Sequence, residues 1–333
     1  MSLRMLVLTD HTLHRERDDL YPLLRAMSQD VRCADLVVAS RAGEHRNPVF
    51  FGADELRFDC RVVDEDFAWS ADHRWFQRPS RTHALADFDG VLLRMGRPMP
   101  DEVLEGLARQ VGDRPVINAP RGIARTGTKA FLTELDAWCP GARVCTSVEE
   151  VLAMAEAREV VVKAIRGYGG GEVLRVGGTS NWVGLLSTSR AAVLAEVARL
   201  LDRDHEVFAM DFLPGVVEGE KRIMMLDGQI VGCARRVPTR NSWLCNPGWG
   251  SRYVASEPDE RELAMARAIA ARLAEHGVVY FGLDTITDAE GLSWVSELNT
   301  LNVGGLRGIG SVTGVDLCGV VARGLWDVLE QGR

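Results

Sequence analysis

The chain has 333 residues, of which 46% are hydrophobic and 26% charged, a composition typical of a globular protein and long enough for two or three domains. Its 39 Lys and Arg residues against 47 Asp and Glu residues give a formal net charge of −8 without a basic block, which argues against a nucleic-acid partner. Apolar runs stay far below the ~20 residues of a membrane span, and seven scattered cysteines without a C-x-x-C spacing argue against a zinc knuckle or a disulfide framework.

The N-terminal third alternates between strand and helix patterns. Strands are expected at residues 5–10, 35–40, 88–94 and 114–120, and helices at 20–27 and 101–111. Because strands that alternate with helices form βαβ units, this order predicts an α/β domain with a parallel sheet. Residues 41–85 give no pattern that can be interpreted.

From about residue 123 the pattern becomes that of an α+β protein. Helices are expected at 127–138, 147–157, 189–204, 258–276 and 315–330, and most of the last third reads as strands. Ser147 and Ser189 stand where helix N-caps are expected.

The stretch VVVKAIRGYGGGEV, residues 160–173, combines a β-branched strand with a glycine-rich turn. It is not a P-loop, because Lys163 precedes the glycines, and it is not a dinucleotide fingerprint, because Glu172 takes the third glycine position. The strand pattern on both sides predicts a hairpin. Its tip, Gly169, Gly170 and Gly171, can bring backbone N–H groups close to an anion. A plain hairpin with a surface lysine is the alternative.

A second hairpin is expected around the turn DAEG at 288–291. With a four-residue loop and no bulge, Asp284 faces Val295, and Glu297 and Asn299 share that face. Three oxygen side chains among apolar strands suit Mg²⁺ held jointly with phosphates. The alternative is the exposed face of a half-solvated sheet.

A lysine on a strand, a glycine hairpin and an acidic patch together indicate an ATP site without a P-loop. In these features the chain resembles the ATP-grasp enzymes, and among them bacterial glutathione synthetase and the related α-L-glutamate ligases. The resemblance covers about residues 89–306. The segments that carry it are DGVLLRMGRPMP, VINAPRGIARTGTKAFL, VVVKAIRGYGGGEVLRV, FAMDFLPGVVEGEKRIMMLDGQIV, GLD and ELN.

The resemblance implies a role for each matching residue. ATP would be bound by Lys129, Lys163, Gly169, Gly170, Gly171, Asp211, Leu213 and Glu220. Mg²⁺, with Mn²⁺ as a substitute, would be held by Asp284, Glu297 and Asn299. The resemblance also assigns Arg94 to the substrate and Arg222 to catalysis. Arg236 is a second catalytic candidate, and Arg240 and Asn246, which lie in a segment that departs from the family, are further candidates for binding the substrate. A surface ion pair is the alternative reading of Arg222 and Arg236.

The implied fold is an α/β domain over residues 1–122, of the type that precedes an ATP-grasp fold, on the substrate side. An α+β ATP-grasp fold of two subdomains follows, a lid over 123–209 and a C-terminal part over 210–333. The chain departs from the family at Arg166, which replaces an acidic residue, and in the segments RRVPTRNSWLCNPGWGSR and TLNVGGLRG. Trp243 and Trp249 in the first segment are either anchors of that loop or walls of a substrate pocket.

The expected function is that of an ATP-dependent carboxylate–amine ligase that works through an acyl phosphate, in specialised metabolism. The expected substrates are a small carboxylate, amino-acid-like or peptide-like, and an amine. Alternatives are glutathione synthetase itself, an ATP-grasp small-molecule kinase, or a nucleotide-binding regulator without catalysis. We also expect a cytoplasmic homo-oligomer with no nucleic-acid or membrane partner. His11 and His14 follow the first strand, where they either contact substrate or lie in an exposed loop.

Overall fold

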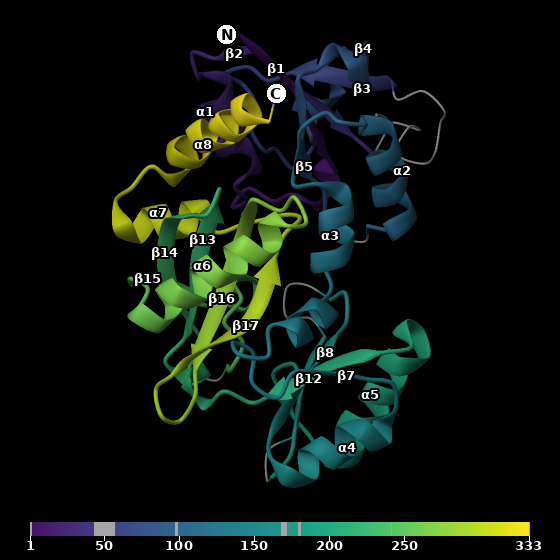
Figure 1. Ribbon diagram of the computed structural model, residues 1–333, viewed down its shortest axis with the longest axis vertical. Helices are drawn as coiled ribbons and strands as arrows, with labels where there is room; N and C mark the ends of the chain where they lie inside the picture. The colour runs from purple at the N-terminus through teal and green to yellow at the C-terminus, as the bar shows by residue number, and fades with distance from the viewer. Residues whose placement is uncertain are drawn as a thin grey trace.

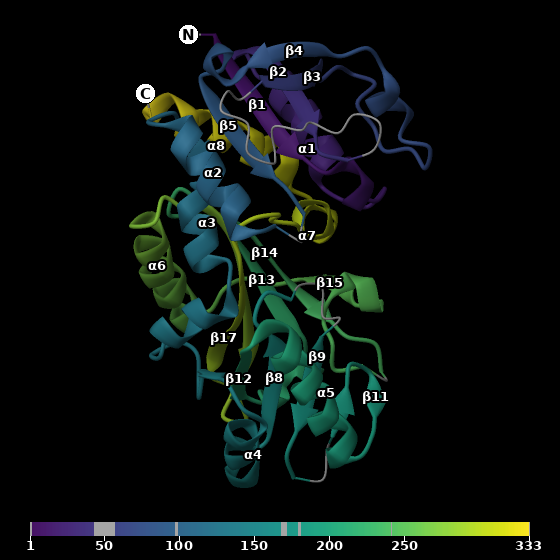
Figure 2. The ribbon, with the colours of Figure 1, turned by 90° about the vertical axis from the view of Figure 1, so that its right-hand side faces the viewer.

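The structure is a computed structural model that describes residues 2–42, 57–96, 99–167, 172–178, 181–240 and 242–332. Its strands form three sheets, here named A, B and C in chain order. Sheets A and B lie at the two ends of the longest axis, with sheet C between them (Figure 1, Figure 2). None of the helices in the described ranges has the length and apolar character needed to cross a membrane. The predicted lid residues Gly169, Gly170 and Gly171 lie outside the described residues.

Sheet A has six strands in the order β4-β3-β2-β1-β5-β6. The strands are β1 (Leu3–Thr9), β2 (Cys33–Ser40), β3 (Arg57–Val62), β4 (Arg81–Ala84), β5 (Gly90–Arg94) and β6 (Val116–Ile117). β1 pairs in parallel with β2 and β5, and β5 with β6, but β3 and β4 are antiparallel additions at one edge. The prediction of a parallel sheet is therefore wrong for this edge. Its strands fall in the segment 41–85, and the mostly alternating burial of β3 is that of a one-sided antiparallel strand.

The helices around sheet A come from both ends of the chain. They are α1 (Leu20–Ser28), α2 (Asp101–Val111), α3 (Pro120–Thr126) and α8 (Leu317–Gln331). The chain's last helix, α8, lies beside α1, and both termini lie at this end of the molecule (Figure 1). The buried Trp326 on α8 donates from Nε1 to the backbone oxygen of Met27 on α1 at 3.1 Å. The N-terminal core is thus completed by the C-terminal helix.

Sheet B has the strand order β11-β10-β9-β8-β12-β7, with antiparallel pairs throughout. Its strands are β7 (Arg143–Cys145), β8 (Val160–Ala164), β9 (Val173–Val176), β10 (Trp182–Val183), β11 (Leu186–Ser187) and β12 (Val207–Asp211). The helices α4 (Val148–Ala157) and α5 (Arg190–Asp204) pack on it and begin at Ser147 and Ser189, whose hydroxyls cap them as predicted. The pairing of β8 with β9 confirms the predicted strand–turn–strand arrangement.

Sheet C has the strand order β15-β14-β13-β16-β17. Its strands are β13 (Glu220–Leu226), β14 (Gln229–Val237), β15 (Arg252–Ala255), β16 (Tyr280–Thr287) and β17 (Ser293–Asn299), and its helices are α6 (Glu260–Ala274) and α7 (Leu306–Thr313). Short 3-10 segments are η1 (His11–Leu13), η4 (Arg74–Gln77), η5 (Leu85–Asp87), η6 (Lys129–Glu134), η7 (Pro214–Val217) and η8 (Pro247–Trp249). The helix expected at 127–138 is only the 3-10 segment η6. The three-part division of the chain at residues 122 and 209 remains a prediction.

Candidate active site

The acidic patch lies on the hairpin of β16 and β17, in a register that the sequence did not predict. Asp284 pairs with Glu297, whereas Val295 pairs with the residue after Asp284, so Ser296 is an extra residue in a β-bulge. The expected pairing of Asp284 with Val295 is therefore wrong, and Val295 points to the opposite face. Because the bulge shifts the alternation by one residue, Glu297 and Asn299 still fall on the face of Asp284.

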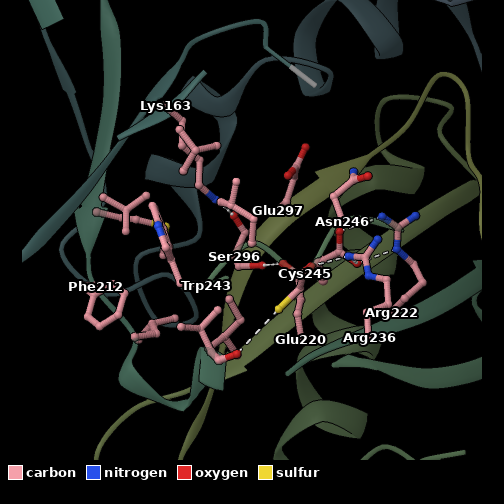
Figure 3. Close-up of a pocket in the computed structure, with 18 of the residues that line it drawn as sticks. Lys163, Phe212, Glu220, Arg222, Arg236, Trp243, Cys245, Asn246, Ser296 and Glu297 are labelled. Atoms are coloured by element: carbon pink, nitrogen blue, oxygen red, sulfur yellow. Dashed lines mark hydrogen bonds and ion pairs between the residues drawn. The ribbon is translucent and has the colours of Figure 1, made fainter. Parts of the chain in front are cut away.

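The bulge residue Ser296 also connects sheet B to sheet C. Its backbone oxygen accepts a hydrogen bond from Lys163 Nζ at 2.8 Å, and its hydroxyl donates to Glu220 Oε1 at 2.6 Å (Figure 3). Lys129, at the start of η6, has its Nζ 3.9 Å from Glu297 Oε1. The two predicted ATP lysines are both mostly buried, and both approach β17. Sequence periodicity gave no signal for Ser296, because a bulge depends on pairing between strands.

Asp284 is the centre of a buried cluster of charges and is only 1% exposed. Its Oδ1 accepts from Arg222 Nε and from Arg236 Nη2 at 2.8 Å, and its Oδ2 accepts from Arg222 Nη2 at 2.7 Å and from Asn299 Nδ2 at 3.3 Å. Burial pushes the pKa of Asp284 upward, but the two guanidinium groups together hold it below its usual range. Glu220 accepts from Arg236, yet burial keeps the pKa of Glu220 above its usual range.

The oxygen donors of this patch fit a hard divalent cation. None of the described residues donates a hydrogen bond to Glu297, whose side chain is 23% exposed and points into the cavity (Figure 3). The lone pairs of Asp284 are occupied by four N–H groups, so a cation there would replace at least one of them. Within the described ranges no three His, Cys, Asp or Glu side chains gather as a metal site, so the predicted set depends on the amide of Asn299.

One cavity above this patch has an apolar half and a polar half. The apolar half is lined by Val161, Val173, Met210, Phe212, Leu213, Val216, Trp243, Leu244 and Ile286. The polar half is lined by Lys163, Glu220, Arg222, Arg236, Asp284, Ser296, Glu297 and Asn299. Figure 3 shows the aromatic rings on one side and the two arginines on the other. The shape and polarity match a ligand with an aromatic ring at one end and a polyanion at the other.

The apolar half lies at the end of β12, where Asp211 and Leu213 were predicted to bind ATP. Asp211 lines the cavity, and its carboxylate pairs with Arg158. Phe212 packs edge-on against Trp243 with ring centroids 6.2 Å apart, and the Arg175 guanidinium lies 3.5 Å above the centre of the Phe212 ring. The residues at the end of β12 therefore form a wall of aromatic and aliphatic groups.

A second cavity, the substrate cleft, adjoins the first and has a volume of about 700 Å³. The two cavities share Arg222, Arg236, Asn246 and Asn299. Of the predicted substrate residues, Arg94 and Asn246 line the cleft, whereas Arg240 is exposed and lines neither cavity. Arg94 is 2% exposed. It donates from Nη1 to the Val303 oxygen at 2.7 Å, and its Nε has no partner among the described residues.

The two N-terminal histidines have different surroundings. His14 is buried and lines the cleft, with its Nε2 2.9 Å from Thr9 Oγ1. His11 lines neither cavity and stacks on Phe76 at 4.2 Å between centroids. Of the two histidines, only His14 lines the cleft.

The divergent loop after β14 contributes to both cavities, although its two tryptophans do not line the cleft. Trp243 lines the first cavity and donates from Nε1 to the Gly184 oxygen at 2.9 Å. Trp249 is 39% exposed and lines neither cavity. The cleft wall from this loop is instead Asn246, Pro247 and Gly248. Neither tryptophan is thus a wall of the substrate cleft.

The family described as "Prokaryotic glutathione synthetase, ATP-grasp domain" matches residues 128–314, more than half of the chain. Glutathione synthetase of Nitrosomonas europaea is 28% identical over 268 residues, 78% of each chain. That of Prochlorococcus marinus is 31% identical over 253 residues, 73% of this chain and 76% of the relative.

Solved structures with the same fold extend over nearly the whole chain. D-cycloserine synthetase DcsG has a TM-score of 0.65 at 18% identity and covers 98% of this chain and 99% of its own. The D-alanine–D-alanine ligase from Coxiella burnetii has a TM-score of 0.60 at 11% identity and covers 99% of this chain and 95% of its own. Because the sequence identities to these two structures are only 18% and 11%, the similarity shows a shared fold and nothing about function.

Proposed function

The chain belongs to the family of the prokaryotic glutathione synthetase ATP-grasp domain, and from this premise we propose that it activates a small carboxylate as an acyl phosphate and joins it to an amine. The membership confirms the resemblance seen in the sequence, and the chain is an ATP-grasp carbon–nitrogen ligase. The acyl phosphate, the residue roles and the substrates are the proposed part.

One observation carries the proposal: Arg222 and Arg236 line both cavities. The first cavity would hold ATP, with adenine in the apolar half and the phosphates in the polar half. The γ-phosphate and the acid in the cleft would therefore meet at these two guanidinium groups. Guanidinium forks suit both phosphate and carboxylate oxygens.

The chemistry has two steps. A carboxylate oxygen attacks the γ-phosphorus of ATP, the bond from that phosphorus to the bridging oxygen breaks, and ADP leaves. The amine nitrogen then attacks the acyl carbon, the bond from that carbon to the phosphate oxygen breaks, and phosphate leaves as the nitrogen loses a proton to it. Negative charge builds up at the phosphoryl group and then at the tetrahedral carbon, so fixed cations at that point lower both barriers.

Each polar residue has a task in this scheme. Lys163 and Lys129, fixed by their contacts around β17, would bind phosphate oxygens. Glu297, with Asp284 and Asn299, would hold Mg²⁺, which neutralises the β- and γ-phosphates when bound. Arg222 and Arg236 would orient the carboxylate against the γ-phosphate. Their anchoring to Asp284 fixes both guanidinium planes before the substrates arrive.

We further propose that the product is a specialised amide or dipeptide-like metabolite and not glutathione. The support is the loop that supplies Asn246–Gly248 to the cleft, together with the run TLNVGGLRG, because both depart from the family pattern. The tryptophans give no support, since neither lines the cleft. Glutathione synthetase itself is the second candidate, because the relatives with the quoted identities carry that name.

The acyl-phosphate step can be tested with a carboxylate labelled with ¹⁸O. Acid–amine pairs are first screened for ADP release in the presence of ATP and Mg²⁺, and the product mass is measured. Condensation loses water, whereas a kinase product gains ~80 Da. We expect one ¹⁸O atom to appear in the released phosphate. A product with added phosphate, or unlabelled phosphate beside an amide, would contradict the proposal.

The product identity is tested with γ-glutamyl-cysteine and glycine as substrates. We expect kcat/KM for this pair to lie at least about 100-fold below that of the best pair in the screen, because polar groups built for another substrate are left unpaired. Efficient glutathione formation would instead identify the chain as glutathione synthetase.

A further inference from the structure

The two arginines shared by the cavities already donate many of their hydrogen bonds to the protein. Arg222 donates to Asp284 from Nε and Nη2, and from Nη1 to the Gly304 oxygen at 2.8 Å. Arg236 donates from Nη2 to both Glu220 and Asp284. These contacts hold the guanidinium groups in place, but they also use part of the hydrogen-bonding capacity that a substrate could meet.

Tyr253 brings a further donor to the same face of sheet C. This residue of β15 is the cross-strand partner of Arg236 on β14. Because directly opposite residues of two antiparallel strands point to the same face, the ring of Tyr253 lies on the face of Arg236. Tyr253 lines the substrate cleft, and its hydroxyl forms no hydrogen bond with the residues that the structure describes. The cleft therefore contains a hydroxyl that is available to a ligand.

The position of this hydroxyl is fixed by packing against α7. A β-carbon on Gly308 would lie 2.3 to 2.6 Å from three carbons of the Tyr253 ring, so the ring rests directly on the glycine. A β-carbon on Gly305 would lie 3.4 Å from Tyr253 Oη and 3.6 Å from Arg222 Cγ. The hydroxyl thus lies at the start of α7, beside the side chain of Arg222.

The hydroxyl of Tyr253 keeps its proton at neutral pH. Burial raises the pKa of Tyr253 above its ordinary value of 10, although the guanidinium groups of Arg236 and Arg222 act in the opposite direction. A group with this pKa donates a hydrogen bond throughout the neutral range, and it does not serve as a base. The chemistry that it can support is the stabilisation of a negatively charged oxygen.

We propose that Tyr253 is a catalytic residue of the amide-forming step, in which its hydroxyl donates a hydrogen bond to the acyl oxygen. This inference rests on the proposed ligase function. As the amine nitrogen bonds to the acyl carbon, the electron pair of the carbonyl double bond moves to the oxygen beside Tyr253. The pair returns when the bond from that carbon to the phosphate oxygen breaks, and the nitrogen gives its proton to the leaving phosphate. Tyr253 keeps its own proton throughout.

The charge on this oxygen changes in opposite directions in the two steps. In the first step the carboxylate becomes an acyl phosphate, so its free oxygen loses negative charge. In the second step the same oxygen gains negative charge as the tetrahedral carbon forms. A hydrogen bond accelerates a step only where it is stronger in the transition state than before it. Loss of the Tyr253 hydroxyl should therefore slow the second step and spare the first.

The test compares the wild type with Y253F, which removes the hydroxyl and keeps the ring. Y21F is the control, because Tyr21 is a buried tyrosine of α1 that lines neither cavity. The substrates are the acid–amine pair selected by the screen for ADP release. The first step is followed without the amine, as movement of ¹⁸O out of the β–γ bridge of labelled ATP. The second step is followed by mixing the amine with enzyme preincubated with ATP, Mg²⁺ and the acid, and by measuring the amide formed in the first turnover.

We expect amide formation in Y253F to be about 10- to 100-fold slower than in the wild type, as for the loss of one donor to a charged oxygen. The rate of isotope exchange and the Kd for ATP should stay within about twofold, and Y21F should match the wild type in all three measurements. Amide formation in Y253F within about twofold of the wild type would overturn the inference. A loss of equal size in both steps would overturn it as well, because a merely structural role affects both.

The wild type separates this inference from the proposed function on which it rests. If the wild type shows neither isotope exchange nor an amide with any acid–amine pair, the ligase mechanism fails, and the role of Tyr253 fails with it. If the wild type shows both and Y253F performs both steps at the same rates, the ligase mechanism stands and only the role of Tyr253 fails.

Discussion

Two carboxylates of the predicted metal set face each other across neighbouring strands, yet their surroundings differ. Asp284 is buried and accepts N–H groups from Arg222, Arg236 and Asn299. Glu297 faces the cavity, with Lys129 as the nearest cation at 3.9 Å. At the residue scale, we therefore expect Glu297 to serve the ligand and Asp284 to serve both the ligand and the fold.

The first prediction concerns Glu297→Gln, which removes the charge and keeps the volume. Because no described hydrogen bond depends on Glu297, the free energy of unfolding should stay within about 0.5 kcal/mol of the wild type. Mg²⁺-dependent ADP release should fall by about 100-fold or more, since a charged metal ligand is lost. Glu290→Gln in the exposed hairpin turn is the control. Near-normal Mg²⁺-dependent turnover in Glu297→Gln would refute the metal assignment.

The second prediction concerns Asp284→Asn, which removes the carboxylate that pairs with the buried Arg222 and leaves the buried Arg236 with Glu220 alone. Removing one partner of a buried ion pair costs about 3–5 kcal/mol, so urea denaturation at neutral pH should show a loss of this order.

The loss of stability in Asp284→Asn should become smaller as the pH is lowered. In the folded state the pKa of Asp284 is held below its ordinary value of 3.8. The ionised Asp284 therefore stabilises the fold fully above pH 3.8, and this stabilisation is lost as the pH falls through the folded pKa. The difference between wild type and Asp284→Asn should therefore shrink as the pH is lowered below about 4. A difference that stays constant down to about pH 2 would contradict the ion-pair account.

At the scale of elements, the loop between β14 and β15 connects the two cavities. Trp243 reaches the turn between β10 and β11 through its hydrogen bond to the Gly184 oxygen, and Asn246 lies where the cavities meet. Sheet B and the loop thus hold the apolar half of the first cavity between them. A change in this loop should therefore affect ATP binding as well as substrate binding.

The third prediction is that Trp243→Phe raises the KM for ATP by about 2- to 10-fold and leaves kcat within about twofold. The phenyl ring keeps the contact with Phe212, but the N–H group that binds the Gly184 oxygen is lost, and a neutral hydrogen bond contributes about 0.5–1.5 kcal/mol. Steady-state kinetics measure both constants, with Trp249→Phe as the control from the same loop. An unchanged KM for ATP in Trp243→Phe would show that this hydrogen bond does not support the site.

At the scale of the whole molecule, sheets A and C are joined by the side chain of Asn118. It is 4% exposed and follows β6. Its Oδ1 accepts from the N–H groups of Val279 and Tyr280 at 3.0 and 2.8 Å, and its Nδ2 donates to the oxygens of Tyr280 and Thr300. Every hydrogen-bonding position of the amide is occupied, so the N-terminal layer is fixed to the start of β16.

The fourth prediction is that Asn118→Asp destabilises the protein more than Asn118→Ala. Alanine leaves buried backbone groups without hydrogen-bond partners, which costs about 1–3 kcal/mol of stability. Aspartate in addition turns a carboxylate oxygen toward two carbonyl oxygens in a buried site, and their repulsion costs more. Thermal or urea unfolding measures the difference. Variants that both remain within about 0.5 kcal/mol of the wild type would show that this amide does not join the two sheets.

The features that depend on neighbouring residues could be predicted from local sequence patterns. Alternation and capping predicted the hairpin of β8 and β9 with Lys163 on it, the helices after Ser147 and Ser189, and most strands of sheet C. These patterns are local, because a strand repeats every two residues and a cap acts within one turn. Together with the order of the motifs, they were enough to identify the family.

The positions at which the side chains of the site meet could not be predicted in this way. The bulge at Ser296 depends on the pairing of two strands, so the sequence predicted the right face for Glu297 and Asn299 with the wrong register. The cleft is built from segments near residues 17, 247 and 307, and the N-terminal core includes the chain's last helix. Contacts between residues so far apart follow from how the sheets pack, and no local periodicity encodes that packing.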